Sequence, residues 1–267
     1  MRNPLPYNLH SHTSRCGHAV GEDVEYVQKA IQAGYEEMAF TDHVMLPGIS
    51  QPGIRGEYSQ AEEYFASVND LRIRYQDQIK IHLGFEAEWY GDVFEGYYRK
   101  LLSRPDFDLF ILGQHCYLED GKLHWYASLP FEERLPRYQK DLLEAMASGI
   151  YTYVAHPDIY VKWHESWDEE TRAVAEQIAM ASNKYHMPLE LNCVQIRSYP
   201  EAAKKPDTLN YPCPMFWDVV ALYGCDVVIG VDAHRPEHYT DTDYDYIVAF
   251  AERHGLRLLK ECPLKKK

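Results

Sequence analysis

Several features that mark specialised protein classes are missing from this 267-residue chain. No stretch approaches the ~20 apolar residues of a membrane-spanning helix, and the opening MRNPLPYNLHSH has no apolar core of a secretory signal. The six cysteines are scattered without a C-x-x-C pair, which argues against a zinc ribbon or a disulfide framework. We therefore expect a cytoplasmic protein that does not bind membranes.

Basic residues are also scarce. The chain has 27 Lys and Arg against 41 Asp and Glu, a net charge of −14, and its only basic run, residues 265–267, reads as a solvated chain end. We expect no nucleic-acid partner, because phosphate contacts need clustered positive charge. No low-complexity linker or break in composition divides the chain, so residues 1–267 are expected to form a single domain.

Short runs rich in β-branched and aromatic residues alternate along the chain with helical patterns. Several runs are continuously apolar, which is typical of buried parallel strands. The runs predict strands at 7–11, 37–41, 79–86, 107–114, 151–155, 188–192 and 226–231. Helical periodicity follows at 23–35, 59–76, 92–104, 130–149, 168–186, 214–224 and 243–255. Seven β-then-α units predict a barrel-like α/β domain with parallel strands.

Histidines and carboxylates concentrate at the ends of these predicted strands. Three histidines stand within the eleven residues NLHSHTSRCGH, in a chain that has 13 in total. In a β/α barrel the C-terminal strand ends meet at one face, where the active site is built. The residues placed there are His10, His12, Asp42, His43, Glu86, Glu88, His115, His156, Asp158, Glu190, Asn192, Asp232 and His234.

These residue types are metal ligands. Imidazole and carboxylate groups bind zinc, manganese and iron, and the rim offers enough donors for two or three ions that share bridging carboxylates. His10 and His12 are two residues apart, so on a strand their side chains point the same way. Asp232 and His234 have the same spacing. His18 follows on the next loop and could fold back over the rim.

The motifs H-x-H, TDH, GFEAE, GQHCY, HPD and DAH, in this order, resemble those of the polymerase-and-histidinol-phosphatase (PHP) superfamily. The segments HSHTSRCGHA and PLELNCVQIR are most similar to the monofunctional histidinol phosphatases. The resemblance implies a distorted seven-stranded (β/α)7 barrel with a trinuclear metal centre at the C-terminal strand ends. Carried over position by position, it implies as metal ligands His10, His12, His18, His43, Glu86, His115, His156, Asp232 and His234.

The expected activity is metal-dependent hydrolysis of a phosphoric monoester. The leading prediction is L-histidinol phosphate as substrate, with L-histidinol and inorganic phosphate as products, in histidine biosynthesis. Bound zinc, iron or manganese ions would lower the pKa of a coordinated water and neutralise phosphoryl oxygens. Alternatives are another small phosphorylated metabolite such as a sugar or nucleotide phosphate, a nuclease-type phosphodiesterase, or a binding module without turnover.

Roles for further residues are predicted less directly. Asp42 is the first candidate for the proton donor, with His18 as the second, although Asp42 could instead orient a ligand. Arg197 is the candidate phosphate clamp, because its guanidinium matches phosphate oxygens; a surface ion pair is the alternative. Tyr117 and Glu119 are candidate contacts for a substrate amine.

Other segments are given supporting roles. The Gly- and Pro-containing segment 45–60 is expected to be a loop, and a lid over the substrate is a hypothesis. Supporting rather than ligating roles are predicted for Glu88 and Asp158, and Glu190 and Asn192 either line the site or form hydrogen bonds in it. The histidines outside the ligand set are expected to be ordinary, with His238 the exception to watch.

Overall fold

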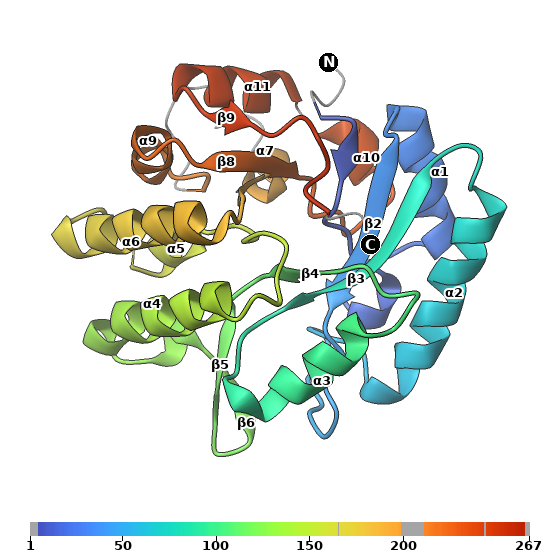
Figure 1. Ribbon diagram of the computed structural model, residues 1–267, viewed down its shortest axis with the longest axis horizontal. Coiled ribbons are helices and arrows are strands. Elements are labelled where there is room, and N and C mark those ends of the chain that lie inside the picture. Colours follow the sequence, from blue (N-terminus) through green and yellow to red (C-terminus); the bar gives the residue numbers. More distant parts are fainter. Residues whose placement is uncertain (1–4, 165, 199–210, 243, 265–267) are drawn as a thin grey trace.

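A curled sheet of parallel strands lies at the centre of the molecule (Figure 1). The structure is a computed structural model, and it describes residues 5–264 apart from 165, 199–210 and 243. The first four strands are hydrogen-bonded in sequence order as β1-β2-β3-β4. Their long apolar runs are buried on both faces, as expected for parallel strands covered by helices. These strands are β1 (Tyr7–Asn8), β2 (Glu37–His43), β3 (Lys80–Ala87) and β4 (Leu109–Leu112).

A second group of parallel strands continues the curve. It consists of β7 (Leu189–Asn192), β8 (Asp226–Gly230) and β9 (Arg257–Leu258), in that order. The segment 151–155, predicted as a strand, does not form a full ladder. Val154 has single bridges to Leu112 and Leu189, and backbone hydrogen bonds also join Thr152 to Phe110 and Ala155 to Leu112. On the opposite side, a single bridge joins Ser11, which follows β1, to Ala233, which follows β8. The two groups are therefore linked by short contacts rather than full ladders.

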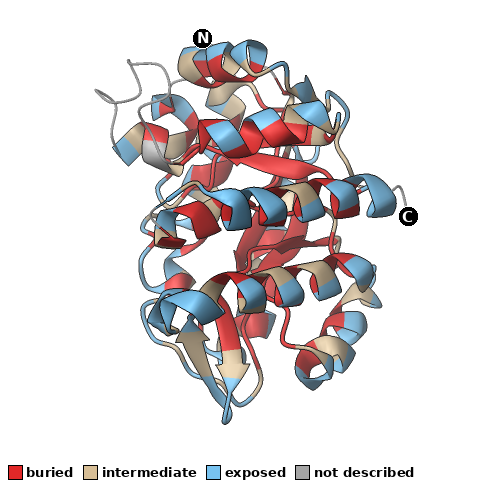
Figure 2. Ribbon diagram, turned by 90° about the vertical axis from the view of Figure 1, so that its left-hand side faces the viewer, coloured by how far each residue is buried: buried red, intermediate tan, exposed pale blue. Residues whose placement is uncertain are grey.

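Helices surround the sheet, with their buried faces turned inward and their exposed faces outward (Figure 2). All seven predicted helices are present within a few residues of their expected bounds. The last one was expected to begin at Asp243, which lies outside the described residues, as does the 265–267 chain end. The helices are α1 (Asp23–Ala33), α2 (Ala61–Arg74), α3 (Asp92–Leu102), α4 (Phe131–Ala147), α6 (Glu169–Tyr185), α9 (Pro214–Leu222) and α11 (Tyr244–Arg253).

A β-hairpin follows the fourth strand, and the sequence reading missed it. Strands β5 (Cys116–Glu119) and β6 (Lys122–Trp125) are antiparallel, with Cys116 opposite Trp125. The Asp120-Gly121 turn between them is the usual signal of such a hairpin, and both residues have positive φ. Other short elements are η1 (Ser14–Cys16), η2 (Tyr58–Gln60), η3 (Tyr126–Ser128), α5 (Ile159–His164), α7 (Val194–Ser198) and α10 (His238–Asp241).

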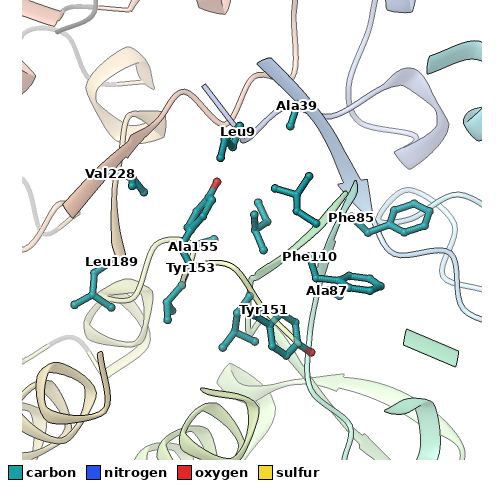
Figure 3. Close-up of a cluster of buried hydrophobic side chains, with 14 of the residues drawn as sticks. Leu9, Ala39, Phe85, Ala87, Phe110, Tyr151, Tyr153, Ala155, Leu189 and Val228 are labelled. Atoms are coloured by element: carbon teal, nitrogen blue, oxygen red, sulfur yellow. The ribbon is translucent and has the colours of Figure 1, made fainter. Parts of the chain in front are cut away.

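Apolar side chains from every part of the sheet fill its interior and the space under the helices. Figure 3 shows Leu9, Phe110, Tyr153, Leu189 and Val228 in this core, and all five are at most 2 % exposed. The strands are thereby held in fixed register, so that groups at their C-terminal ends have defined positions. Among the described residues, no helix has the length and apolarity needed to cross a membrane.

Candidate metal centre

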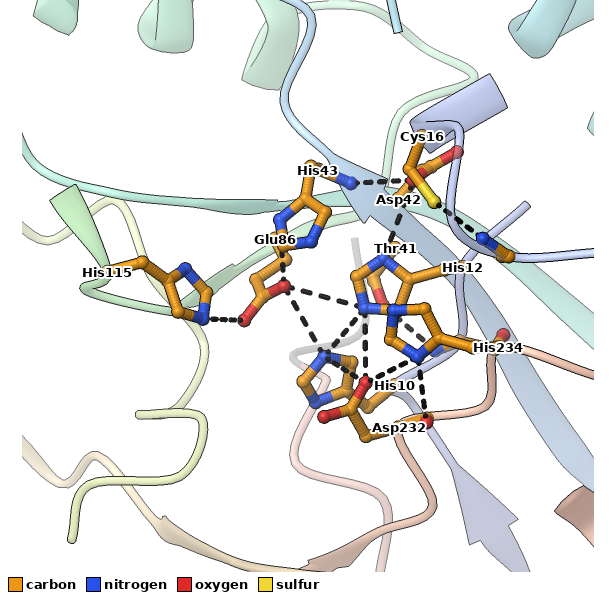
Figure 4. A network of polar contacts seen from close by, with 12 residues as sticks. His10, His12, Cys16, Thr41, Asp42, His43, Glu86, His115, Asp232 and His234 are labelled. Atoms are coloured by element: carbon orange, nitrogen blue, oxygen red, sulfur yellow. Dashed lines mark hydrogen bonds and ion pairs between the residues drawn. The ribbon is translucent and has the colours of Figure 1, made fainter. Parts of the chain in front are cut away.

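All nine predicted ligands converge at the C-terminal ends of the strands, and Figure 4 shows His10, His12, His43, Glu86, His115, Asp232 and His234 among them. They border a cavity of about 530 Å³. His10 is the exception among them: it is fully buried behind the cavity wall, with its Nε2 3.2 Å from Nε2 of His12. The predicted ligands that line the cavity are His12, His18, His43, Glu86, His115, His156, Asp232 and His234.

Glu86 stands between two groups of imidazoles. Its Oε1 is 2.7 Å from Nε2 of His156 and 3.5 Å from Nε2 of His115. Its Oε2 is 3.2 Å from Nδ1 of His43 and 3.5 Å from Nε2 of His12. Two oxygens that each face two or more ring nitrogens give the geometry of a carboxylate that bridges two cations.

Asp232 collects a second group of nitrogens on one oxygen. Its Oδ1 is 3.3 Å from Nε2 of His12, 3.3 Å from Nδ1 of His234 and 3.6 Å from Nε2 of His10. This buried oxygen has no hydrogen-bond partner among the described residues. Ligands bonded to one Zn²⁺ at about 2.0–2.2 Å in tetrahedral geometry lie roughly 3.4 Å apart. The spacing therefore fits donors arranged around a shared ion.

A third group lies at the mouth of the cavity. His18, on the loop after η1, and His234 bring their Nε2 atoms to 2.9 Å. The ligating atoms of His12, His43 and His234 also lie within 4.8 Å of one another. The overlapping groups allow more than one divalent cation to be held side by side.

Burial and neighbouring charges shift the pKa values of several predicted ligands. Burial alone would raise the pKa of Glu86, but His115, His10 and His43 hold this pKa well below its usual range. The pKa of Asp232 is lowered in the same way, because His10 and its other imidazole neighbours outweigh burial. Burial lowers the pKa of His43 well below its usual value, whereas neighbouring carboxylates outweigh burial and raise the pKa of His10, His12 and His115. Both carboxylates are thus ionised, and a cation that binds here would displace protons from the imidazoles.

Carboxylates behind the ligands fix their orientation. The two oxygens of Glu190 lie 2.9 and 3.0 Å from Nδ1 of His10, which leaves Nε2 of that ring free to bind a metal. Asn192 donates from its amide to Glu190 at 2.7 Å and to Asp232 at 3.1 Å. Of the two roles predicted for Glu190 and Asn192, the structure supports hydrogen bonding.

Asp42, predicted as the first candidate proton donor, lies where it could orient a ligand, which is the alternative role predicted for it. It is fully buried and does not line the cavity. Its carboxylate accepts hydrogen bonds from the hydroxyl of Thr13 and, at 2.9 Å, from the backbone N–H of His43, and it lies 3.5 Å from Nδ1 of His12. This position suits a group that orients His12.

Asp158 lies further from the centre than its sequence position suggests. Its Oδ2 accepts hydrogen bonds from the backbone N–H of Cys213 at 2.7 Å and from the indole of Trp217 at 3.1 Å. It therefore anchors the start of α9 and has no hydrogen bond to a predicted ligand.

Local backbone features show how the sheet accommodates the centre. His156 and Asp232 have φ of +34° and +51°, a region that costs ordinary residues about 1–3 kcal/mol and is found at functional sites. Gly113 lies against Glu86, and Gly230 lies against Glu190; a Cβ at either glycine would overlap the carboxylate. The sequence reading missed both glycines, although glycine within a strand often marks such a close approach.

Arg197 lines the cavity from α7, as its predicted role requires. Its guanidinium donates to the backbone carbonyl of Asp232 at 2.9 Å and to Oγ1 of Thr242 at 3.1 Å. His238 lines the cavity as well, and its Nδ1 accepts from the backbone N–H of His234 at 3.2 Å. Of the histidines outside the ligand set, His238 is therefore the one that the cavity includes.

The structure places the predicted substrate contacts Tyr117 and Glu119 outside the cavity lining. Glu119 is exposed at the hairpin turn, and the buried Tyr117 stacks on His124 with ring centroids 5.4 Å apart. Side chains alternate between the two faces of a strand. Tyr117 therefore points away from the face that Cys116 and Trp125 share, and Trp125 lines the cavity instead.

Comparison with known proteins agrees with this geometry. The family described as "PHP domain" matches residues 8–193. A probable histidinol-phosphatase of Deinococcus radiodurans is 29% identical over 237 residues, which cover 85% of each chain. The histidinol-phosphatase of Lactococcus lactis is 26% identical over 248 residues, which cover 86% of this chain and 84% of the relative.

A solved structure shares the fold. It is the Lactococcus lactis histidinol phosphate phosphatase complexed with zinc, L-histidinol and phosphate. It superimposes with a TM-score of 0.71 at 21% sequence identity, and the match covers 97% of this chain and 98% of that one.

Proposed function

The chain belongs to the PHP domain family, and on this premise we propose that it hydrolyses L-histidinol phosphate to L-histidinol and inorganic phosphate. The relatives named histidinol-phosphatase support this substrate, because they align over more than four-fifths of both chains. The observation that carries the proposal is the convergence of imidazoles on the oxygens of Glu86 and Asp232 beside a cavity.

We propose two or three divalent ions at this centre. One group of donors surrounds Oδ1 of Asp232, and a second surrounds Oε1 of Glu86. A third consists of His12, His43 and His234, with His18 beside His234. Zinc is the first candidate because the Lactococcus lactis structure contains it, and iron and manganese accept the same ligand types. Such ions, when bound, lower the pKa of water and stabilise charge on phosphoryl oxygens.

The residues of the chain supply the remaining functions. Arg197 contributes a fixed positive charge at the cavity wall, and its guanidinium suits a phosphate oxygen. We keep His18 as the candidate proton donor, since it lines the cavity and Asp42 does not. Asp42 and Glu190 hold the rings of His12 and His10 in place. Asp42, Glu190, His10 and His12 are almost fully buried, so water is restricted on this side of the centre.

The wider proposal follows the family. We propose a single domain over residues 1–267 that works in the cytoplasm, in histidine biosynthesis. We also propose that the segment around Val154 takes the place of a fifth strand in a distorted seven-stranded barrel. Its bridges to Leu112 and Leu189 support this topology.

Phosphate release from three substrates tests the function. L-histidinol phosphate, p-nitrophenyl phosphate and a nucleotide would be compared with and without a chelator, and a histidine auxotroph would be complemented with the gene. We expect strong preference for the first substrate, loss of turnover with chelator, and growth without histidine. Preference for another small phosphoester would replace the substrate but keep the reaction. Selective DNA cleavage would overturn the proposal, and the acidic net charge of −14 argues against it.

A further inference from the structure

A buried arginine connects the loop after β2 to the metal centre. Arg55 is only 2 % exposed, although arginine is seldom buried without partners. Its Nη1 donates to the backbone carbonyl of Val44 at 2.9 Å, and its Nε donates to Oε1 of Gln51 at 2.9 Å. Its Nη2 donates to Oε1 of Glu88 at 3.0 Å.

Glu88 connects Arg55 to a predicted metal ligand. The residue follows β3 and is 1 % exposed, and its Oε1 lies 3.4 Å from Nδ1 of His115. The other ring nitrogen of His115 faces Oε1 of Glu86 at 3.5 Å. A carboxylate beside Nδ1 favours the tautomer that carries the proton on Nδ1. The lone pair of Nε2 is then free to bind a metal. Arg55, Glu88 and His115 thus form one continuous polar chain.

We propose that Arg55 is a positioning residue, which holds Glu88 and, through it, orients His115 toward the metal centre. The inference rests on the proposed metal centre. A buried carboxylate without a partner is strongly destabilising, and Arg55 donates to the same Glu88 oxygen that faces His115. The planar fork of arginine suits this task, because it binds Glu88, Gln51 and Val44 simultaneously.

The same contacts make the loop a fixed wall of the cavity. Ile54, the neighbour of Arg55, lines the cavity. The loop is also held where the hydroxyl of Tyr97 donates to the carbonyl of Met45 at 2.9 Å. Opening the segment 45–60 as a lid would draw Arg55 out of its buried partners. The structure therefore favours a static wall over the lid hypothesis, and it ties the wall to His115.

Four variants separate positioning from simple stability. Arg55→Met and Glu88→Met each leave one buried charge without its partner, and the double variant Arg55→Met/Glu88→Met removes both. Arg55→Lys keeps the charge but loses the fork. Arg172→Met is the matched control, since Arg172 forms an exposed pair with Glu176 at 3.0 Å on α6. Each holoprotein is measured by thermal unfolding, by zinc titration against a chromophoric chelator, and by hydrogen exchange over residues 46–57.

We expect one zinc equivalent to bind ~10–100-fold more weakly in both single methionine variants, the loss typical of removing a ligand's outer partner. The double variant should recover thermal stability but not zinc affinity, because His115 still lacks its carboxylate. Arg55→Lys should lose part of the affinity. Hydrogen exchange should rise over 46–57 when Arg55 is replaced, and Arg172→Met should match the wild type throughout.

Two results would overturn the proposal. If the double variant recovers both stability and zinc affinity, the pair is structural only. If every variant binds zinc as the wild type does, Glu88 does not orient His115. A wild-type protein that binds fewer than two zinc equivalents would instead refute the metal centre itself, and this separates the two failures.

Discussion

Strand β3 takes part in a histidine–glutamate pair at each of its ends, and only one of them belongs to the candidate centre. At the N-terminal end, Nε2 of His82 lies 2.8 Å from Oε2 of Glu37. At the C-terminal end, Oε1 of Glu86 lies 2.7 Å from Nε2 of His156. The two distances are nearly equal, so distance alone does not distinguish an ion pair from a metal centre.

The surroundings of the two pairs differ. The Glu37 side chain is 26 % exposed, and its other cationic partner is Lys80, at 3.1 Å. The Glu86 side chain is 1 % exposed, and imidazoles surround both of its oxygens without any lysine or arginine contact among the described residues. A buried carboxylate among several convergent ring nitrogens is a set of donors that a metal ion can occupy. The number of ring nitrogens around each carboxylate oxygen therefore distinguishes the C-terminal end of β3, where the candidate metal centre lies, from its N-terminal end.

The largest expected difference comes from replacing one residue of each histidine–glutamate pair by glutamine. Glu86→Gln removes the bridging charge, and we expect kcat for histidinol phosphate to fall ~10³-fold, together with loss of bound metal. His82→Gln should change kcat less than about twofold, because His82 forms a hydrogen bond with Glu37 away from the cavity. Phosphate release and elemental analysis measure both. Equal losses in the two variants would contradict the distinction.

Removing the metal should loosen one end of the sheet only. Ligands present at ~1,000 times their Kd stabilise a fold by about 4 kcal/mol, so a chelator should lower the free energy of unfolding by roughly that amount. Hydrogen exchange should rise around His10–His12 and Asp232–His234 but stay constant around His82. A chelator that changes neither stability nor exchange would count against bound ions in the folded protein.

Replacing Arg197 tests whether the cavity binds an anionic substrate. Replacing it by methionine keeps the aliphatic length and removes the fixed charge at the cavity wall. A charged hydrogen bond contributes about 1.5–3 kcal/mol, so kcat/KM should fall ~10–100-fold, with zinc content unchanged. Steady-state kinetics and elemental analysis check this. Unchanged kinetics would make Arg197 only a support for Asp232 and Thr242, its present partners.

Gly113 tests how tightly Glu86 is enclosed. Gly113→Ala places a methyl group on the Glu86 carboxylate, and overpacking of this kind costs about 1–3 kcal/mol. Gly96→Ala in α3 is the matched control, since nothing lies within 4 Å of its added methyl, and it should stabilise the helix by about 0.5–1 kcal/mol. Urea unfolding measures both. If Gly113→Ala is as stable as the wild type, Glu86 is free to move.

The smallest kinetic effects are expected from substitutions on the two faces of the β5–β6 hairpin. Trp125→Ala should lower kcat/KM several-fold, because Trp125 lines the cavity and an aromatic contact to the substrate would contribute about 0.5–1.5 kcal/mol. Tyr117→Phe and Glu119→Gln should stay within about twofold of the wild type, since their side chains lie outside the cavity. The reverse ranking in steady-state kinetics would restore the sequence-based assignment.

Much of the fold could be predicted from local pattern. The apolar runs of β2 and β3 and the periodicity of α1 and α6 are strong signals, and the structure has all four elements. The segment 151–155 has strand composition, yet Val154 is its only residue with β-bridges to the neighbouring strands. Strand pairing depends on neighbours distant in sequence, and composition alone does not contain them.

The candidate site divides in the same way. The ligand set could be predicted because strand ends in a parallel fold share one face, and the structure brings all nine residues together. Asp42, Tyr117 and Glu119 lie outside the cavity lining, and sequence position does not say whether a side chain points into a cavity or behind it. Arg55 was missed because the loop that carries it has no period from which burial could be inferred.

Anomalous diffraction at the zinc edge, from crystals of the zinc-loaded protein, tests the central claim most directly. The account predicts at least two peaks at bonding distance from oxygens of Glu86 or Asp232, and none beside His82 and Glu37. Peaks confined to surface side chains, or a single peak that Glu86 does not contact, would contradict it.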